Sequence, residues 1–180
     1  FTLRIAFALE ADGLHQRITV TNDSPLDMPF ALGFHTTFAL PFVQDGRVED
    51  VRLHLGVAEE IVRNMDTFLP TGEVLADSPL RQALLKGELQ PCAHTISRHF
   101  AMDASREMYL TDAVRRVQLI YRAKPPYAYW MLYSGGSRDF LCVEPQTWVN
   151  NCPNAPFDRE KTGFAFVAPG ETKTYETIFT

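Results

Sequence analysis

The sequence predicts an all-β domain, most simply a β-sandwich in which two sheets enclose one core. Several runs of residues alternate between apolar and polar, which is the two-residue period of a half-buried strand. Turn-forming residues separate these runs, and only one stretch has the start and stop signals of a helix. The 180 residues contain no repeat, low-complexity run or linker, so we expect a single domain spanning residues 1–180.

The chain opens with two strands that we expect to pair as a hairpin. Thr2 to Glu10 places four apolar side chains on one face, and Leu14 to Thr21 continues after the turn Ala11-Asp12-Gly13. The four apolar residues are Leu3, Ile5, Phe7 and Leu9. Because Phe1 already lies inside the alternating pattern, we expect the domain to lack an N-terminal portion that would complete its sheets.

The rest of the chain predicts further strands and one short helix. Ser78 is a good N-cap, Pro79 fits the first helical turn, and Gly87 can end the helix. We expect a loop at Asn64–Leu75, and the last two strands should form a closing hairpin. The expected strands are Val48–Val57, Val114–Ala123, Tyr127–Tyr133, Phe140–Glu144, Gly163–Ala168 and Thr172–Phe179.

Composition excludes some classes of function. The chain has 22 acidic and 17 basic residues, a formal net charge of −5, which argues against binding a nucleic-acid backbone. No apolar run approaches the roughly 20 residues of a membrane helix. The cysteines are Cys92, Cys142 and Cys152, an odd number without a CxxC pair, which favours a reducing compartment. We therefore expect a cytoplasmic protein that binds neither nucleic acid nor membrane.

Glu144 follows an apolar run and stands directly before a proline. Pro145 cannot donate a ladder hydrogen bond and disfavours helix at Glu144, so we expect Glu144 at a strand end near solvent. A carboxylate beside an apolar sheet needs a partner, which makes Glu144 either a structural ion-pair residue or a tuned acid or base. Cys142, in the same run, is most simply a small core residue.

Histidines are the other candidates for chemistry. His35 lies in Met28–Phe42 among several phenylalanines, where it is either a core residue with a satisfied hydrogen bond or a functional residue. His15 and His54 are expected to face solvent. Cys92, His94 and His99 fit no standard zinc spacing, so we predict no metal site.

Four segments of the chain resemble the aldose 1-epimerase (galactose mutarotase) family, in the family's order. Gly33-Phe34-His35 is similar to the segment with the acid histidine, and Cys142-Val143-Glu144-Pro145-Gln146-Thr147 to that with the base glutamate. Leu69–Glu73 resembles a family loop, and Gly163–Thr172 resembles the closing hairpin. The match corresponds to the C-terminal part of the family's chain.

The resemblance implies a galactose mutarotase-like (supersandwich) β-sandwich and an isomerase that interconverts the α and β anomers of a free sugar. Glu144 would be the base and His35 the acid, with no cofactor. Trp130, Gln146 and Phe38 would bind the sugar, although packing in the core is the competing interpretation for Trp130. The partner would be a small-molecule sugar.

The chain also departs from the family's pattern. Ser97–Phe100 stands where the family has a substrate-binding aspartate, and Thr36-Thr37 replaces Pro-Tyr, so the resemblance leaves the sugar open. One alternative is a hexose-6-phosphate 1-epimerase, which needs a cationic pocket. Arg98, Arg115 and Arg116 are the candidates for that pocket. A second alternative is a non-catalytic carbohydrate-binding domain on the same fold.

Overall fold

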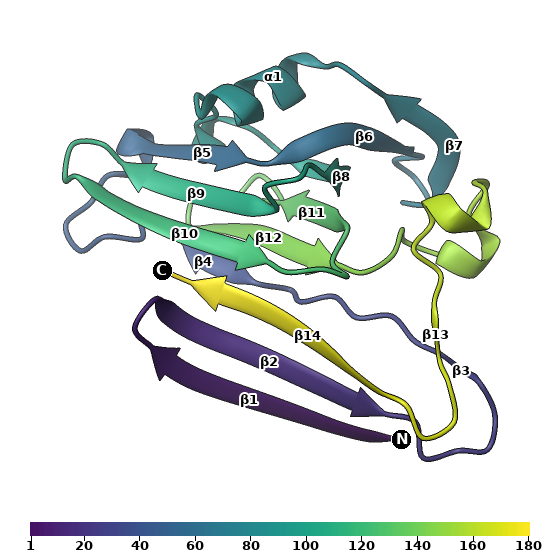
Figure 1. The fold of residues 1–180 in the computed structure, drawn as a ribbon. Helices are drawn as coiled ribbons and strands as arrows, with labels where there is room; N and C mark the ends of the chain where they lie inside the picture. The colour runs from purple at the N-terminus through teal and green to yellow at the C-terminus, as the bar shows by residue number, and fades with distance from the viewer.

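The computed structural model describes residues 1–180 as two six-stranded antiparallel sheets, a two-stranded ribbon and one α-helix (Figure 1). In the first sheet the strand order is β1(Thr2–Glu10), β2(Gly13–Thr21), β14(Thr172–Phe179), β10(Val117–Ala123), β9(Glu107–Asp112) and β5(Val51–Leu55). In the second it is β4(Thr37–Ala39), β12(Phe140–Gln146), β11(Tyr129–Tyr133), β8(Ser97–Met102), β6(Val57–Arg63) and β7(Pro70–Leu75). The ribbon pairs β13(Phe166–Val167) with β3(Met28–Pro29). The expected all-β fold class is confirmed.

The main core draws apolar side chains from both sheets. Large fully buried side chains, each worth roughly 1.5 to 3 kcal/mol of transfer free energy, come from β9, β10, β8, β11 and β12. They include Leu110, Tyr121, Phe100, Trp130, Leu132, Leu141 and Val143. Because Leu141 and Val143 point into this core, the alternate residues of β12 point to the other face of the second sheet.

The single helix, α1(Pro79–Lys86), forms where the sequence predicts it. The Ser78 hydroxyl accepts a hydrogen bond from the backbone N–H of Arg81, which satisfies one of the free donors at the helix start. Gly87 ends the helix with φ of 68°, a left-handed conformation that glycine adopts without a steric penalty. Leu84 of α1 is buried in the core. Neither α1 nor any of the short 3₁₀ helices is long and apolar enough to cross a membrane.

The first two strands form the expected hairpin, but the apolar face of β1 is not half-buried as predicted. Leu3, Ile5, Phe7 and Leu9 are 41, 55, 63 and 85 % exposed. The register places Ile5 beside the buried Ile18 of β2, so the apolar side chains do lie on the core-facing side of the sheet. However, β1 is the edge strand, at the outer rim of the molecule in Figure 1, and its apolar face lies open.

Three other expectations are corrected. Asn64–Leu75 is not wholly a loop, because its second half is β7, which pairs with β6. The closing hairpin does not form, since β13 pairs with β3 while β14 inserts between β2 and β10. The sequence pattern did not predict β6, β8 and β9 as separate strands. The expected hairpin fails because each of its strands has a partner far away in the sequence.

Candidate active site

Glu144 lies inside β12 rather than at its end. The strand continues through Pro145 to Gln146, and Pro145 is paired with Trp130 of β11, which corrects the predicted strand end. The missing N–H of Pro145 is tolerated because β4 begins only at Thr37, so no regular ladder runs beside Pro145 on that side. Since Leu141 and Val143 face the core, Cys142 and Glu144 face the opposite side.

Two backbone hydrogen bonds place His35 opposite Glu144. The N–H of Val143 donates to the carbonyl of Thr36 at 3.0 Å, and the N–H of Phe34 donates to the carbonyl of Pro145 at 3.1 Å. These bonds flank both residues, so the backbone itself sets His35 against Glu144. A side chain at Gly33 would put its Cβ 3.1 Å from Cγ of Gln146, which explains why a glycine precedes Phe34 at this close approach.

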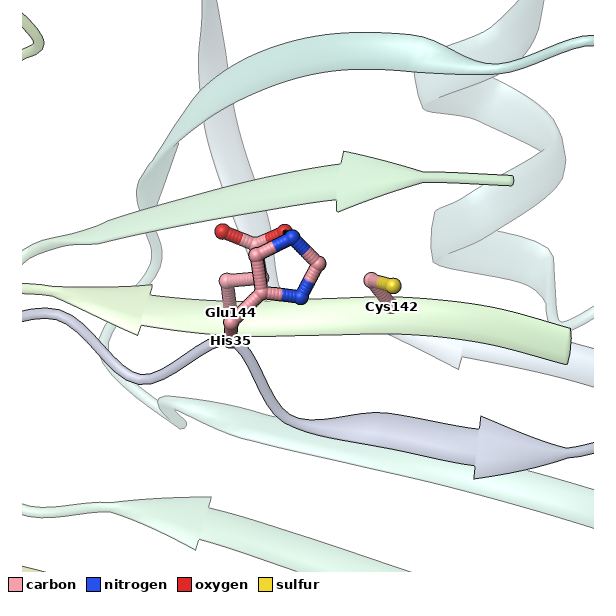
Figure 2. Close-up of side chains that lie close together, drawn as sticks. All are labelled: His35, Cys142 and Glu144. Carbon is pink, nitrogen blue, oxygen red and sulfur yellow. Dashed lines mark ion pairs between the residues drawn. The ribbon is translucent and has the colours of Figure 1, made fainter. Parts of the chain in front are cut away.

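The imidazole of His35 lies over the carboxylate of Glu144, as Figure 2 shows. Nε2 of His35 is 3.4 Å from Oε1 of Glu144. The two side chains differ strongly in exposure, 70 % for His35 and 9 % for Glu144. The pair therefore presents a largely buried carboxylate beneath an imidazole that solvent and ligands can reach.

The surroundings of Glu144 shift its protonation equilibrium. Burial raises the pKa of Glu144, while the charge of His35, a hydrogen bond with Gln146 and the charge of Arg63 act in the opposite direction. A higher pKa makes the carboxylate a stronger base. Gln146, one of the expected sugar-binding residues, thus lies beside the candidate base.

Two residues further along the sheet were not selected for this site by sequence reasoning. They are His99 on β8, two strands from β12, and Arg63 on β6, three strands away. Glu144 is paired with Met131, and Met131 with His99, so the three share one face, with Glu144 and His99 roughly 10 Å apart at their Cα atoms. Nη2 of Arg63 donates to the hydroxyl of Ser97 at 2.9 Å. Arg63, Ser97 and His99 line a hollow of about 210 Å³.

His99 has an unusual environment for a polar side chain. Its ring is fully buried, and neither ring nitrogen has a hydrogen-bond partner within the protein. Burial, followed by the charge of Arg63, lowers the pKa of His99 to about 3, so the ring is neutral. The only signal in the sequence was the position itself, since His99 lies in the stretch that replaces the family's aspartate.

Other expected residues lie elsewhere. Trp130 is fully buried and Phe38 is 8 % exposed, and both pack against Tyr121 in the core. They lie on the face of the second sheet opposite Glu144, so the prediction that they contact a sugar is wrong. The cause is that β11 and β4 carry large apolar residues on the core side, where an aromatic side chain packs without needing a ligand.

The arginines expected to form a cationic pocket are not gathered at one site. Arg115 lies in the turn between β9 and β10, where its Nη1 is 3.1 Å from Asp112 and 3.2 Å from Asp50, so it is a structural ion-pair residue. Arg98 lines the same hollow as Arg63 but is paired with Glu60 at 3.2 Å. His15, expected to face solvent, is buried between Glu176 and Asp12.

A sequence model of the aldose 1-epimerase family matches residues 1–180, the whole chain. The chain belongs to the aldose 1-epimerase family. The expected family is therefore confirmed.

Solved structures support the same fold for this epimerase-family chain. A galactose mutarotase-like protein from Clostridium acetobutylicum has a TM-score of 0.91 and 25 % identity, covering 98 % of this chain and 54 % of its own. A galactose mutarotase-like protein from Lactobacillus casei has a TM-score of 0.70 and 23 % identity, with 98 and 62 % covered. Galactose 1-epimerase from Lactobacillus acidophilus has a TM-score of 0.63 and 18 % identity, with 99 and 56 % covered. The epimerase-family chain thus spans less than two thirds of these proteins.

Proposed function

We propose that this protein accelerates the interconversion of the α and β anomers of a free aldose, with Glu144 as the base and His35 as the acid. The observation that carries the proposal is the 3.4 Å approach of an exposed imidazole to a sheltered carboxylate on the open face of a sheet. Membership of the aldose 1-epimerase family supports the same reaction class.

The reaction needs one proton acceptor and one proton donor. Glu144 removes the proton of the anomeric hydroxyl, the bond between C1 and the ring oxygen breaks, and protonated His35 gives its proton to that oxygen. Rotation about the C1–C2 bond presents the other face of the aldehyde. Closure then returns the proton from the hydroxyl to His35 and that of Glu144 to the new anomeric oxygen, so both residues end as they began.

The remaining groups of the face fit this role as positioning residues. Gln146 lies beside Glu144 and has hydrogen-bonding capacity for a sugar hydroxyl. The elevated pKa of Glu144, caused by burial, brings the base closer to neutral pH, where proton transfer is most efficient.

Polarimetry on freshly dissolved α-D-glucose tests the proposal. The wild-type chain is expected to speed the approach to the equilibrium rotation, and Glu144→Gln should lose about 100-fold or more of the acceleration. Glu88→Gln, an exposed glutamate after α1, is the matched control and should keep the rate. A Glu144→Gln chain as fast as the wild type would refute the assignment. Sugar binding without any acceleration would instead favour the non-catalytic carbohydrate-binding alternative.

A sugar with an anionic substituent is a second candidate substrate, favoured by Arg63. Its guanidinium is partly buried, so its pKa is lowered by burial and then by the charge of Arg98, and it contacts the Ser97 hydroxyl rather than a carboxylate. The charges of Glu144 and Glu60 act in the opposite direction, but Glu144 forms its ion pair with His35 and Glu60 with Arg98. A partly buried cation without a carboxylate in direct contact is costly, and a phosphate would supply that contact. A higher kcat/KM for glucose 6-phosphate than for glucose would favour the hexose-6-phosphate 1-epimerase. The cytoplasmic location expected from the cysteines stays a prediction.

A further inference from the structure

Three different metal-ligating side chains meet at the face that carries His35 and Glu144. A ring nitrogen of His35, the sulfur of Cys142 and a carboxylate oxygen of Glu144 all lie within 4.8 Å of one another. Figure 2 shows Cys142 and Glu144 on the same strand, with His35 reaching over Glu144 from the neighbouring segment. The acid–base chemistry proposed above makes no use of Cys142.

The local structure explains why the cysteine joins the pair. Cys142 and Glu144 are two residues apart in β12, so their side chains lie on the same face. Thr37 is paired with Cys142 across the ladder, and its hydroxyl lies 3.3 Å from the sulfur and 3.1 Å from the carbonyl of His35. The three donors thus come from a regular strand and from a segment tied to that strand.

The burial of the donors suits a site that an ion can enter from solvent. Cys142 and Glu144 are 1 and 7 % exposed and form the floor, while the side chain of His35 is 70 % exposed and forms the outer wall. The side beside His35 is open to solvent, so an ion can enter there and keep one position for water.

The donor set is one that zinc prefers. Imidazole nitrogen, thiolate sulfur and carboxylate oxygen are the three ligand types of protein zinc sites, and a sulfur donor disfavours magnesium and calcium. Two ligands on a tetrahedral zinc, each at about 2.0 to 2.1 Å, are about 3.3 to 3.4 Å apart. The distance between Nε2 of His35 and Oε1 of Glu144 is 3.4 Å, which is that spacing.

We propose that His35, Cys142 and Glu144 form a binding site for zinc or a similar divalent transition metal, and that its occupation reversibly blocks the epimerase chemistry. When the metal binds, a bond forms between it and the sulfur, and the thiol proton leaves to solvent. The same ion occupies the nitrogen that would donate a proton and the oxygen that would accept one. Only the blocking clause rests on the proposed function, since binding depends on the three donors alone.

Cobalt(II) is the probe that tests binding without using activity. Titration of the reduced, metal-free chain with Co²⁺ should produce a thiolate-to-cobalt charge-transfer band and the intense visible bands of tetrahedral cobalt, which Zn²⁺ then removes. Cys142→Ser should abolish the charge-transfer band. Cys152→Ser, a buried cysteine on another segment, is the matched control and should keep it. A band that survives in Cys142→Ser, or no band in the wild type, would overturn the site.

A second variant is needed because Cys142→Ser changes a buried residue and could lose metal binding through misfolding alone. His35 is mostly exposed, so His35→Gln should leave the fold intact. The variant should weaken Co²⁺ binding by at least about 100-fold, because losing a residue that only supports a metal ligand already costs up to about that much. Unchanged affinity in that variant would remove His35 from the ligand set and contradict the proposal.

Polarimetry in the presence of Zn²⁺ then tests the block. The catalysed rate should fall to the uncatalysed rate as the site fills and recover fully when EDTA is added. A wild-type chain that binds Co²⁺ but shows no mutarotation at any metal concentration would sink the proposed function and leave the site standing. An active chain whose rate Zn²⁺ does not change would contradict the proposal that metal binding blocks the reaction.

Discussion

At the scale of single residues, the main feature is the unequal exposure of His35 and Glu144. The buried carboxylate projects from a regular strand of the sheet, whereas the exposed imidazole can meet a ligand that arrives from solvent. Holding a base rigidly and near its target removes part of the entropy cost of the reaction. We therefore propose that Glu144 and Gln146 orient the sugar.

Arg63 should affect one substrate class more than another. With Arg63→Gln, kcat/KM for glucose 6-phosphate is expected to fall by about 10-fold or more, because a charge-assisted hydrogen bond is worth roughly 1.5 to 3 kcal/mol. The value for glucose should change much less. Arg47→Gln, whose side chain is 72 % exposed, is the control and should alter neither. Equal losses for both sugars would show that Arg63 only supports the sheet.

At the residue scale the sequence led to His35 and Glu144, and the structure places these two 3.4 Å apart. It failed for Trp130 and Phe38 because strands with apolar residues on both faces do not reveal which face meets the core. The register of β11 and of β4 against β12 places both residues on the core face, since Phe38 is paired with Leu141 and Trp130 with Pro145. The sequence did not assign His99 to this face, because the alternation of Ser97–Met102 is blurred by polar residues on both faces.

At the scale of elements, a cluster of charged groups ties the β1–β2 hairpin to the rest of the first sheet. Glu176 of β14 lies 2.8 Å from Nδ1 of His15 and 2.7 Å from Nε of Arg17, both on β2. It also lies 2.5 Å from Nζ of Lys124, just after β10. The cluster couples three neighbouring strands through one carboxylate.

This cluster should make stability depend on pH at both ends. Burial alone would raise the pKa of Glu176, but hydrogen bonds from Lys124, His15 and Arg17 outweigh it and hold the pKa at about 2. Its contribution is therefore present above the unfolded pKa of about 4.3 and is lost as the pH falls toward 2. Hydrogen bonds to Glu176 and Asp12 raise the pKa of His15, whose contribution is present below about pH 6.5 and is lost as the pH rises through the folded value.

Urea unfolding across pH 2 to 9 checks this expectation. Glu176→Gln should flatten the loss of unfolding free energy between about pH 4.3 and 2 and also weaken the loss above about pH 6.5. Glu88→Gln, outside the cluster, should follow the wild-type curve. Parallel curves for Glu176→Gln and the wild type would mean that the cluster contributes no pH-dependent stability.

Elements could be predicted where the signal is local. The caps of α1 and the β1–β2 hairpin each depend on residues close in sequence, and both form as expected. β13 and β14 do not pair, because β14 has a longer partner in β2, which is far away in the sequence. Pairing over such distances is decided by the whole sheet, and alternation along one strand contains no information about it.

At the scale of the whole molecule, the main feature is the apolar face of β1, which no other element covers. The pattern of Thr2–Glu10 correctly predicted a strand with one apolar face, but a pattern within one strand cannot tell whether another layer covers it. An exposed edge strand with a row of large apolar side chains favours association.

The chain of 180 residues should therefore self-associate as its concentration rises. Replacing Ile5 with Lys and Phe7 with Glu should reduce the association while changing the unfolding free energy by no more than about 0.5 kcal/mol. Leu26→Lys alters an exposed leucine outside β1 and serves as the control, with association unchanged. Sedimentation velocity measures the outcome. A monomer at every concentration, with a cooperative melt, would contradict this expectation.

The most direct measurement of the central claim is a double-variant cycle of His35→Gln and Glu144→Gln, followed by polarimetry of α-D-glucose. Because acid and base act in the same step, each single variant should lose about 100-fold or more of the catalysed rate, and the double variant should be little slower than the slower single one. Wild-type rates in either single variant would contradict the account, since proton transfer would then run through other groups.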